Sequence, residues 1–147
     1  MSQVNEPQPI TDDLSPIADA LLKHINTWEQ KPCQFKLTLE KDGTSAAMQP
    51  LPGASKLRTY VTGSYIGQFP FALYLRCGGD DTKSRLDAMA ALNKASAWLM
   101  SAPLPTISAD IDAQRFEMTT LPAQTAVYED RTEDYRAVFR FTFKKSL

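Results

Sequence analysis

The sequence predicts an α+β domain, in which a mostly antiparallel sheet of four to five strands carries two helices on one face. Two segments have the apolar spacing of amphipathic helices, and other segments alternate apolar and polar residues as half-buried strands do. Two helices are too few to cover both faces of such a sheet, so both are expected on the same face. A length of 147 residues fits one domain.

The N-terminal part of the chain is expected to hold a leader and a helix. Residues 1–13 are polar, contain two prolines and predict a mobile leader ahead of a single domain over residues 14–147. Apolar residues then recur at helical spacing over residues 14–28, and Pro16 suits the first turn of a helix. This helix has one wide apolar stripe, which must lie on something larger.

The segment after the first helix is expected to contain a strand and a long loop. Residues 33–39 alternate apolar and polar side chains, which predicts a half-buried strand. Residues 44–56 combine small residues with two prolines and a glycine. This composition is typical of a loop, with room for a short strand at 46–49.

Two further strands are expected in the centre of the chain. Residues 57–66 are rich in β-forming side chains, and residues 69–77 alternate with phenylalanine and leucine on one face. Gly67 and Gln68 would form the turn between them. Pro70 indicates an irregular start or an edge position for the later strand.

The second helix is predicted over residues 82–101, which contain good helix formers and no glycine or proline. Its several alanines are small enough to pack closely against a sheet or a neighbouring subunit. The expected apolar stripe, with the residues that widen it, consists of Leu86, Met89, Ala90, Asn93, Ala97 and Met100, with Leu92, Ala95 and Leu99.

The C-terminal part is expected to form two strands around an acidic loop. Residues 115–121 favour a strand, and residues 122–134 predict an irregular connection rich in carboxylates. Residues 135–144 show the clearest alternation in the chain, with aromatic residues on one face and basic residues on the other.

Composition excludes several classes of protein. The net charge is −1, from 16 basic and 17 acidic residues, which argues against a protein that coats nucleic acid or an anionic membrane. No apolar run approaches the roughly 18 residues of a membrane span, and the N-terminus lacks the features of a secretory signal. The two cysteines lie in alternating apolar runs and are expected to be reduced, buried side chains. We expect synthesis in a cytoplasm.

The sequence offers no convincing active site. His24 is the only histidine, so there is no second histidine to share a metal with it or to be its partner in a catalytic triad. A dyad of His24 with Cys33 or Cys77 would need a cysteine outside the core. Residues 78–81, Gly-Gly-Asp-Asp, lack the pattern of a phosphate-binding loop, and aspartates there suit a helix N-terminus instead. Catalytic, cofactor-binding and metal sites are therefore all predicted to be absent.

Charged residues near the C-terminus suggest contacts between subunits. Basic residues of the last strand share its polar face, where we expect salt bridges with acidic loops of a neighbouring subunit. Contact of this face with nucleic acid is a weaker alternative. The loops 42–56 and 122–134 are long for a small domain and are candidate contact regions. The candidate assembly interface consists of Arg131, Glu133, Asp134, Arg136 and Arg140.

Three segments resemble a known family. Residues 80–99 (DDTKSRLDAMAALNKASAWL) and 116–143 (FEMTTLPAQTAVYEDRTEDYRAVFRFTF) resemble the minor capsid or tail terminator (tail completion) proteins of long-tailed phages of Gram-positive bacteria, and residues 14–28 are similar to their first helix. The resemblance extends from about residue 14 to the end of the chain. It rests on patterns typical of the family and includes no catalytic motif.

The resemblance implies a structural virion protein without enzyme activity or cofactor. Such a subunit would form a hexameric ring at the head-proximal end of the tail tube, end tube growth and join the tail to the head. Its partners would be other copies of itself, the tail-tube protein and the head–tail connector or stopper protein, with DNA passing through the lumen without specific recognition and no membrane. It would be made in the cytoplasm of the bacterial host and reside in the virion at the head–tail junction.

The alternative is a cytoplasmic α+β domain that binds a small molecule or acts as an enzyme. His24 and Cys33 are close in sequence, which is the feature that motivates it. A deep pocket that contains both His24 and a cysteine would favour this alternative over the assembly protein.

Overall fold

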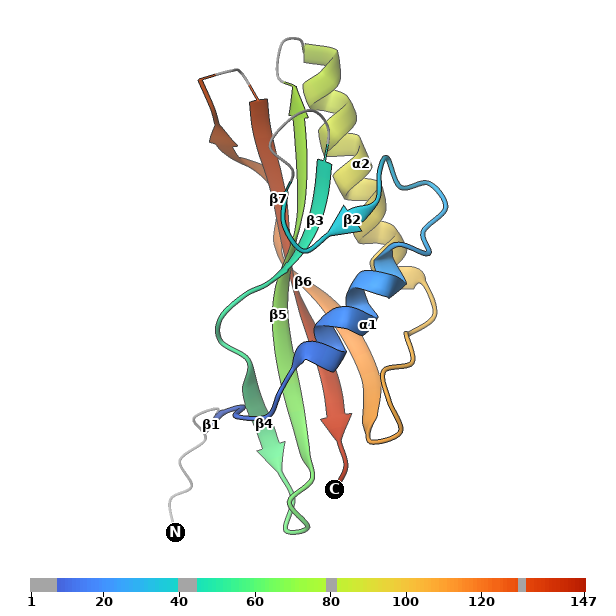
Figure 1. Cartoon of the computed structure of the whole chain (residues 1–147), viewed down its shortest axis with the longest axis vertical. Coiled ribbons are helices and arrows are strands. Elements are labelled where there is room, and N and C mark those ends of the chain that lie inside the picture. The colour runs from blue at the N-terminus through green and yellow to red at the C-terminus, as the bar shows by residue number, and fades with distance from the viewer. Residues whose placement is uncertain (1–7, 40–44, 79–81, 130–131) are drawn as a thin grey trace.

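A computed structural model describes residues 8–39, 45–78, 82–129 and 132–147 (Figure 1). Over these residues the chain forms two helices and one sheet of seven strands, with mostly antiparallel pairing. The predicted α+β class is confirmed, with more strands than the four to five expected. Two predicted features, the turn at Asp42 and Gly43 and the interface residue Arg131, lie outside the described residues.

Three long strands form the centre of the sheet. The strands β5 (Tyr65–Gly78) and β7 (Thr132–Lys145) pair antiparallel along their whole lengths, and β6 (Ile111–Val127) pairs with the other side of β7. The alternation predicted for the last strand is confirmed, because its aromatic residues lie in the core. The fully buried aromatic side chains of the core are Phe71, Phe139, Phe141 and Phe143.

Two shorter strands follow one another along the remaining side of β5. The strand β3 (Ser45–Pro50) pairs with its second half, and β4 (Ser55–Thr59) pairs with its first half. The short strand expected at 46–49 is confirmed within β3, but the long loop expected over 44–56 shrinks to residues 51–54 in the described part of the chain. Ala46 and Met48 belong to the core under the helices, and Met48 is fully buried.

The outermost strands are very short. The strand β1 (Gln8–Pro9) pairs with β4, and β2 (Phe35–Lys36) runs parallel to β3. The predicted strand over 33–39 shrinks to these two residues, and the side chain of Asn26, just after α1, holds Phe35 by hydrogen bonds of 2.8 and 3.0 Å to its backbone. Leu37 is consequently left half exposed.

The chain turns before β5 at a different place from the one predicted. The N–H of Gly63 donates to the carbonyl of Tyr60 at 2.9 Å, and Gly63 has a φ of 91°, which favours glycine. Gly67 lies inside β5, where the ring of Phe143 comes so close that an added Cβ would lie 2.7 Å from it. The predicted turn at Gly67 and Gln68 is wrong, because Gly67 serves close packing.

Pro70 lies in the interior of the sheet. Its carbonyl accepts a hydrogen bond of 2.9 Å from the N–H of Leu51, which connects β3 to β4. In a strand the N–H and C=O of one residue point to the same side. The missing N–H of Pro70 therefore falls at the gap between β3 and β4, where no ladder bond is lost.

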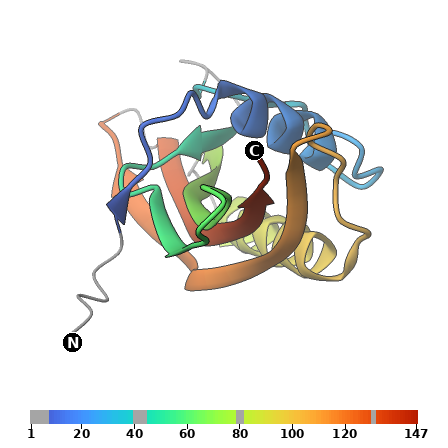
Figure 2. The same cartoon turned by 90° about the horizontal axis from the view of Figure 1, so that it is seen from below.

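Both helices pack on the aromatic face of the curved sheet (Figure 2). The helix α1 (Ser15–Ile25) buries Ile17, Leu21 and Ile25. The helix α2 (Thr82–Ser101) has the predicted bounds, and it buries the residues predicted to widen its apolar stripe rather than the main stripe. Its buried apolar residues are Ala88, Leu92, Ala95 and Leu99. Neither helix is long and apolar enough to cross a membrane, judged over the described part of the chain.

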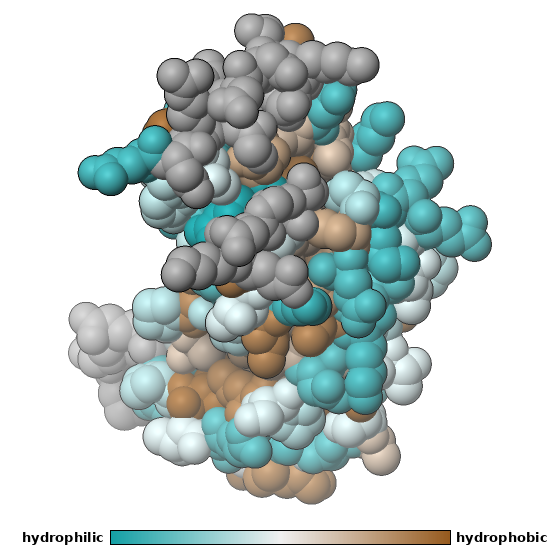
Figure 3. All heavy atoms as spheres, turned by 45° about the horizontal axis from the view of Figure 1, so that its top comes forward, coloured by the Kyte–Doolittle hydropathy of each residue, from teal (hydrophilic) through white to brown (hydrophobic). Residues whose placement is uncertain are grey.

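The other side of α2 is solvent-exposed, and the face of the molecule seen in Figure 3 also shows hydrophobic residues between hydrophilic ones. Leu86 is 64% exposed and Met100 is 47% exposed, although both were predicted to lie in the main buried stripe.

Residues 8–13, the described part of the predicted leader, lie against the sheet: Ile10 donates its N–H to the carbonyl of Ala54 at 3.3 Å, and the Tyr65 hydroxyl donates to Asp12 at 2.6 Å.

Candidate functional site

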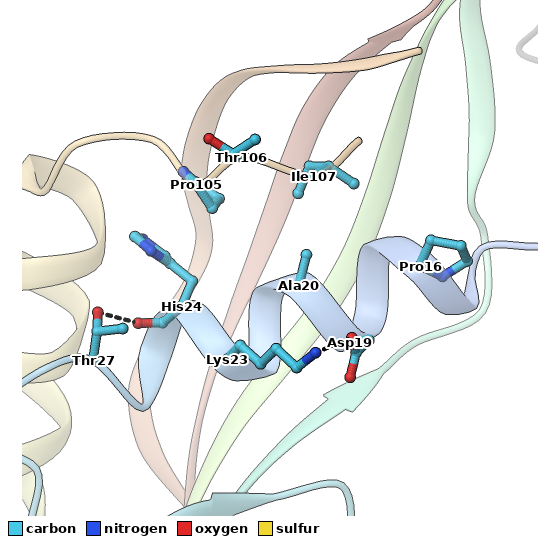
Figure 4. A pocket seen from close by; sticks show the side chains of 9 residues that line it. All are labelled: Pro16, Asp19, Ala20, Lys23, His24, Thr27, Pro105, Thr106 and Ile107. Atoms are coloured by element: carbon cyan, nitrogen blue, oxygen red, sulfur yellow. Dashed lines mark hydrogen bonds and ion pairs between the residues drawn. The ribbon is translucent and has the colours of Figure 1, made fainter. Parts of the chain in front are cut away.

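A hollow between α1 and the chain that leads into β6 contains the histidine (Figure 4). Its volume is about 420 Å³, and Asp19 and Lys23 form an exposed ion pair of 2.9 Å at its α1 wall. The residues that line it are Pro16, Asp19, Ala20, Lys23, His24, Thr27, Pro105, Thr106 and Ile107.

His24 joins three elements of the fold. Its ring lies 4.9 Å from the Trp98 ring of α2 and 6.0 Å from the Phe116 ring of β6, measured between centroids, and it stacks parallel to Phe116. Its Nε2 is buried and has no hydrogen-bond partner within the described structure. Burial disfavours the charged imidazolium and lowers the pKa of His24 below its ordinary value of 6.5.

The hollow does not provide the pair of groups that nucleophilic catalysis requires. Neither Cys33 nor Cys77 lines it, and both are free thiols. A general base acts on a nucleophile within hydrogen-bond reach. Of the lining hydroxyls, that of Thr27 donates to the backbone carbonyl of His24 at 2.7 Å, and the buried Nε2 of His24 has no hydrogen-bond partner in the described structure. The residues described here also contain no group of three or more potential metal ligands. The combination of His24 and a cysteine in one deep pocket is thus not found in this hollow.

The predicted acidic loop at 122–134 is instead a strand hairpin. The strand β6 continues to Val127, and β7 begins at Thr132. Glu133 and Asp134 are 1% and 4% exposed, so the hairpin holds both carboxylates inside the subunit. The Tyr135 hydroxyl donates to Glu133 at 3.1 Å.

Asp134 is the centre of a hydrogen-bonded cluster. Arg76 donates to its two carboxylate oxygens from Nε at 2.7 Å and from Nη2 at 3.0 Å, and the Tyr128 hydroxyl donates to it at 2.8 Å. These contacts raise the pKa of Arg76 and of Tyr128. Arg76 and Asp134 face each other across the register of β5 and β7, which no local sequence pattern reveals.

The remaining interface candidates lie on the face of the sheet away from the helices, which we call the outer face. Arg136 is opposite Tyr74, and Arg140 is opposite Glu117, to which it donates at 2.7 Å. Glu117 also accepts a hydrogen bond of 2.6 Å from Arg115. Hydrogen bonds from the two guanidinium groups, with the larger effect from Arg140, hold the pKa of Glu117 below its ordinary value.

The four predicted interface residues that the structure describes therefore differ in position. Glu133 and Asp134 are buried and contact partners in their own subunit, whereas Arg136 and Arg140 are half-buried on the outer face. An intersubunit role for these residues stays a prediction. Burial leaves Glu133 and Asp134 little surface to offer another subunit.

Comparison with known proteins gives a similarity of fold. No family model matches the chain, and no curated protein matches it. A chain from a structure described as "Virion of native gene transfer agent (GTA) particle" superposes with a TM-score of 0.59 at 13% sequence identity. The match covers 87% of this chain and 97% of that chain. At this identity the likeness establishes a shared fold.

Proposed function

We propose that this chain is a structural virion protein of the phage type, and that it acts as a tail terminator. In this role it forms a ring at the head-proximal end of the tail tube, ends tube growth and joins the tail to the connector. The observation that carries the proposal is the fold match, which extends over nearly the whole length of a virion chain. The resemblance of residues 80–99 and 116–143 to tail terminator sequences points to the same class.

The ring is proposed to be a hexamer, with the tube protein on one side and the connector or stopper protein on the other. A ring needs two different surfaces on each subunit, because head-to-tail contacts close by rotation. Exposed apolar side chains lie on two different elements within the described residues: Leu86 and Met100 on α2, and Leu121 and Val127 on β6. Two such separate surfaces support heterologous assembly.

The proposed role is non-enzymatic and needs no cofactor. The only histidine packs against two aromatic rings, and the hollow beside it brings no nucleophile to it. These contacts suit a side chain that joins α1 to α2 and β6, and they favour the assembly protein over the alternative of a small-molecule-binding or enzymatic domain.

Deletion of the gene in the phage or particle genome that encodes the chain tests the proposal. We expect tails of abnormal length that are not joined to heads, seen by negative-stain electron microscopy, and restoration by a plasmid copy. A matched control restores the gene with Lys23→Gln, an exposed residue of α1 outside both surfaces. Normal tails attached to heads in the deletion strain would contradict the proposed role.

A further inference from the structure

The outer face carries an excess of positive charge in a chain whose net charge is −1. Along β7, the residues Arg136, Arg140 and Lys144 recur at every fourth position, and Arg115 lies beside them on β6, opposite Thr142. We call these four residues the basic row. Two acidic residues accompany them on the paired strand, namely Asp112 opposite Lys144 and Glu117 opposite Arg140.

Hydrogen-bonding capacity on this face is also incomplete. The Nε atoms of Arg136 and Arg140 and the hydroxyl of Thr142 are buried without a hydrogen-bond partner in the described structure. Thr142 itself is 2% exposed. Glu117 serves both Arg115 and Arg140, so a single carboxylate is shared by two guanidinium groups. These buried atoms are out of reach of a partner, but the shared carboxylate leaves the positive charge of the row only partly neutralised within its own subunit.

The outer face buries small residues although neither described helix covers it. Ala47 and Ala72 are fully buried on the outer face, although both described helices pack on the opposite one. Stems of neighbouring arginine and tyrosine side chains cover such small residues while the charged heads reach water. The result is a broad surface with cationic heads, most of them partly exposed, as Arg140 is at 38% and Arg115 at 63%.

We infer that the basic row is a docking surface for the phosphate backbone of double-stranded DNA. From Arg136 to Lys144 the row extends about 27 Å at about 3.4 Å per residue, which is comparable with one turn of duplex at about 34 Å. Regularly spaced cations fit a regularly spaced polyanion and require no base sequence. The inference adds a DNA-contacting surface to the proposed function. It rests on that function only because the proposed ring is the place where DNA would meet the chain.

Other partners fit this surface less well. An acidic peptide cannot add to β7 as a strand, because β5 and β6 already pair with both of its sides. Single-stranded DNA binds through exposed aromatic platforms. On this face Tyr74 is half-buried, and the two exposed rings already contact cationic side chains: Tyr60 lies 5.5 Å from the Lys144 ammonium and Tyr128 lies 5.1 Å from the Arg76 guanidinium.

The test measures binding of the full chain to a short fluorescent DNA duplex by anisotropy over a range of salt concentrations. Each phosphate contact contributes about −0.9 to the slope of log K against log salt, so three to four contacts predict a slope between about −2.7 and −3.6. Arg136→Gln and Lys144→Gln should each reduce the magnitude of this slope by about 0.9. Lys94→Gln on α2 changes the net charge equally and should leave the slope unchanged.

Three results would overturn the inference. One is absence of duplex binding at low salt, and another is an equal loss of slope in Lys94→Gln and in the two row variants. The third is binding of polyglutamate through the row without binding of DNA, which would identify an acidic protein partner. Thermal unfolding midpoints check that the variants fold. A negative result leaves the terminator role to be judged by tail morphology alone, because the two experiments share no readout.

Discussion

Replacement of Asp134 by asparagine separates a role inside the subunit from a role between subunits. Asp134→Asn keeps the shape of the side chain but removes its charge and one of its two acceptor oxygens. Both partners are largely buried, with side-chain exposures of 16% for Arg76 and 6% for Asp134. The variant removes the carboxylate charge that contacts the Arg76 guanidinium and places an amide N–H₂ against a donor.

The expected loss of stability follows from these contacts. Removal of one member of a buried ion pair costs about 3–5 kcal/mol, and we take about 3 kcal/mol because Arg76 retains some contact with water. For a domain of this size, that corresponds to a fall of roughly 6–12 °C in Tm. Thermal unfolding of the isolated chain, followed by circular dichroism, measures the change.

Two controls make the measurement decisive. Asp19→Asn breaks an exposed pair with Lys23 and should change the stability by about 0.5 kcal/mol or less. Arg76→Gln combined with Asp134→Asn should cost less than the sum of the two single variants, because the pair is then removed together. An unchanged Tm in Asp134→Asn with impaired assembly would refute the reasoning and assign Asp134 to an interface between subunits.

Three more predictions concern the core and its histidine. Gly67→Ala should lower Tm, because its Cβ would meet the Phe143 ring at 2.7 Å, and overpacking costs about 1–3 kcal/mol; an unchanged Tm would argue against this contact. Phe139→Ala should cost about 3–5 kcal/mol in urea unfolding, since the ring is fully buried; a loss below that of the exposed control Leu121→Ala would argue against the core assignment. The pKa of His24 is lowered in the folded state, so the unfolded state binds more protons. The stability that this group contributes is complete above pH 6.5 and is lost as the pH falls through the lower folded pKa. His24→Phe should weaken this pH dependence of thermal unfolding, and a profile identical to that of the unchanged chain would contradict the prediction.

Elements with strong local signals were predicted well from the sequence. The bounds of α2 agree because glycines precede it, prolines follow it and neither interrupts it. The strand β7 agrees because strict alternation of aromatic and polar residues has no helical interpretation. Both signals lie in the sequence of a single element, so no tertiary information is needed.

Features that depend on packing were predicted poorly. The helix α2 has apolar residues on two sides, and only the sheet decides that Leu92 and Leu99 are buried while Leu86 and Met100 are exposed. Gly67 has the composition of a turn but is required by the ring of Phe143, which lies far away in sequence. Local patterns do not contain these long-range contacts.

The charged residues illustrate the same limit. A run of carboxylates after Val127 is typical of a solvated loop, yet Asp134 finds its counter-ion on Arg76, 58 residues earlier. The pairing follows from the register between β5 and β7. A surplus of basic residues on the last strand was visible in the sequence, but the incomplete hydrogen bonding around Thr142 was not.

The central claim is that this chain forms the ring that ends the tail tube at the head. Gold-labelled antibody against the chain, applied to purified particles from the strain that encodes it and viewed by electron microscopy, tests that claim most directly. The account predicts label confined to the junction between head and tail. Label along the tube, over the head shell, or absent from intact particles would contradict it.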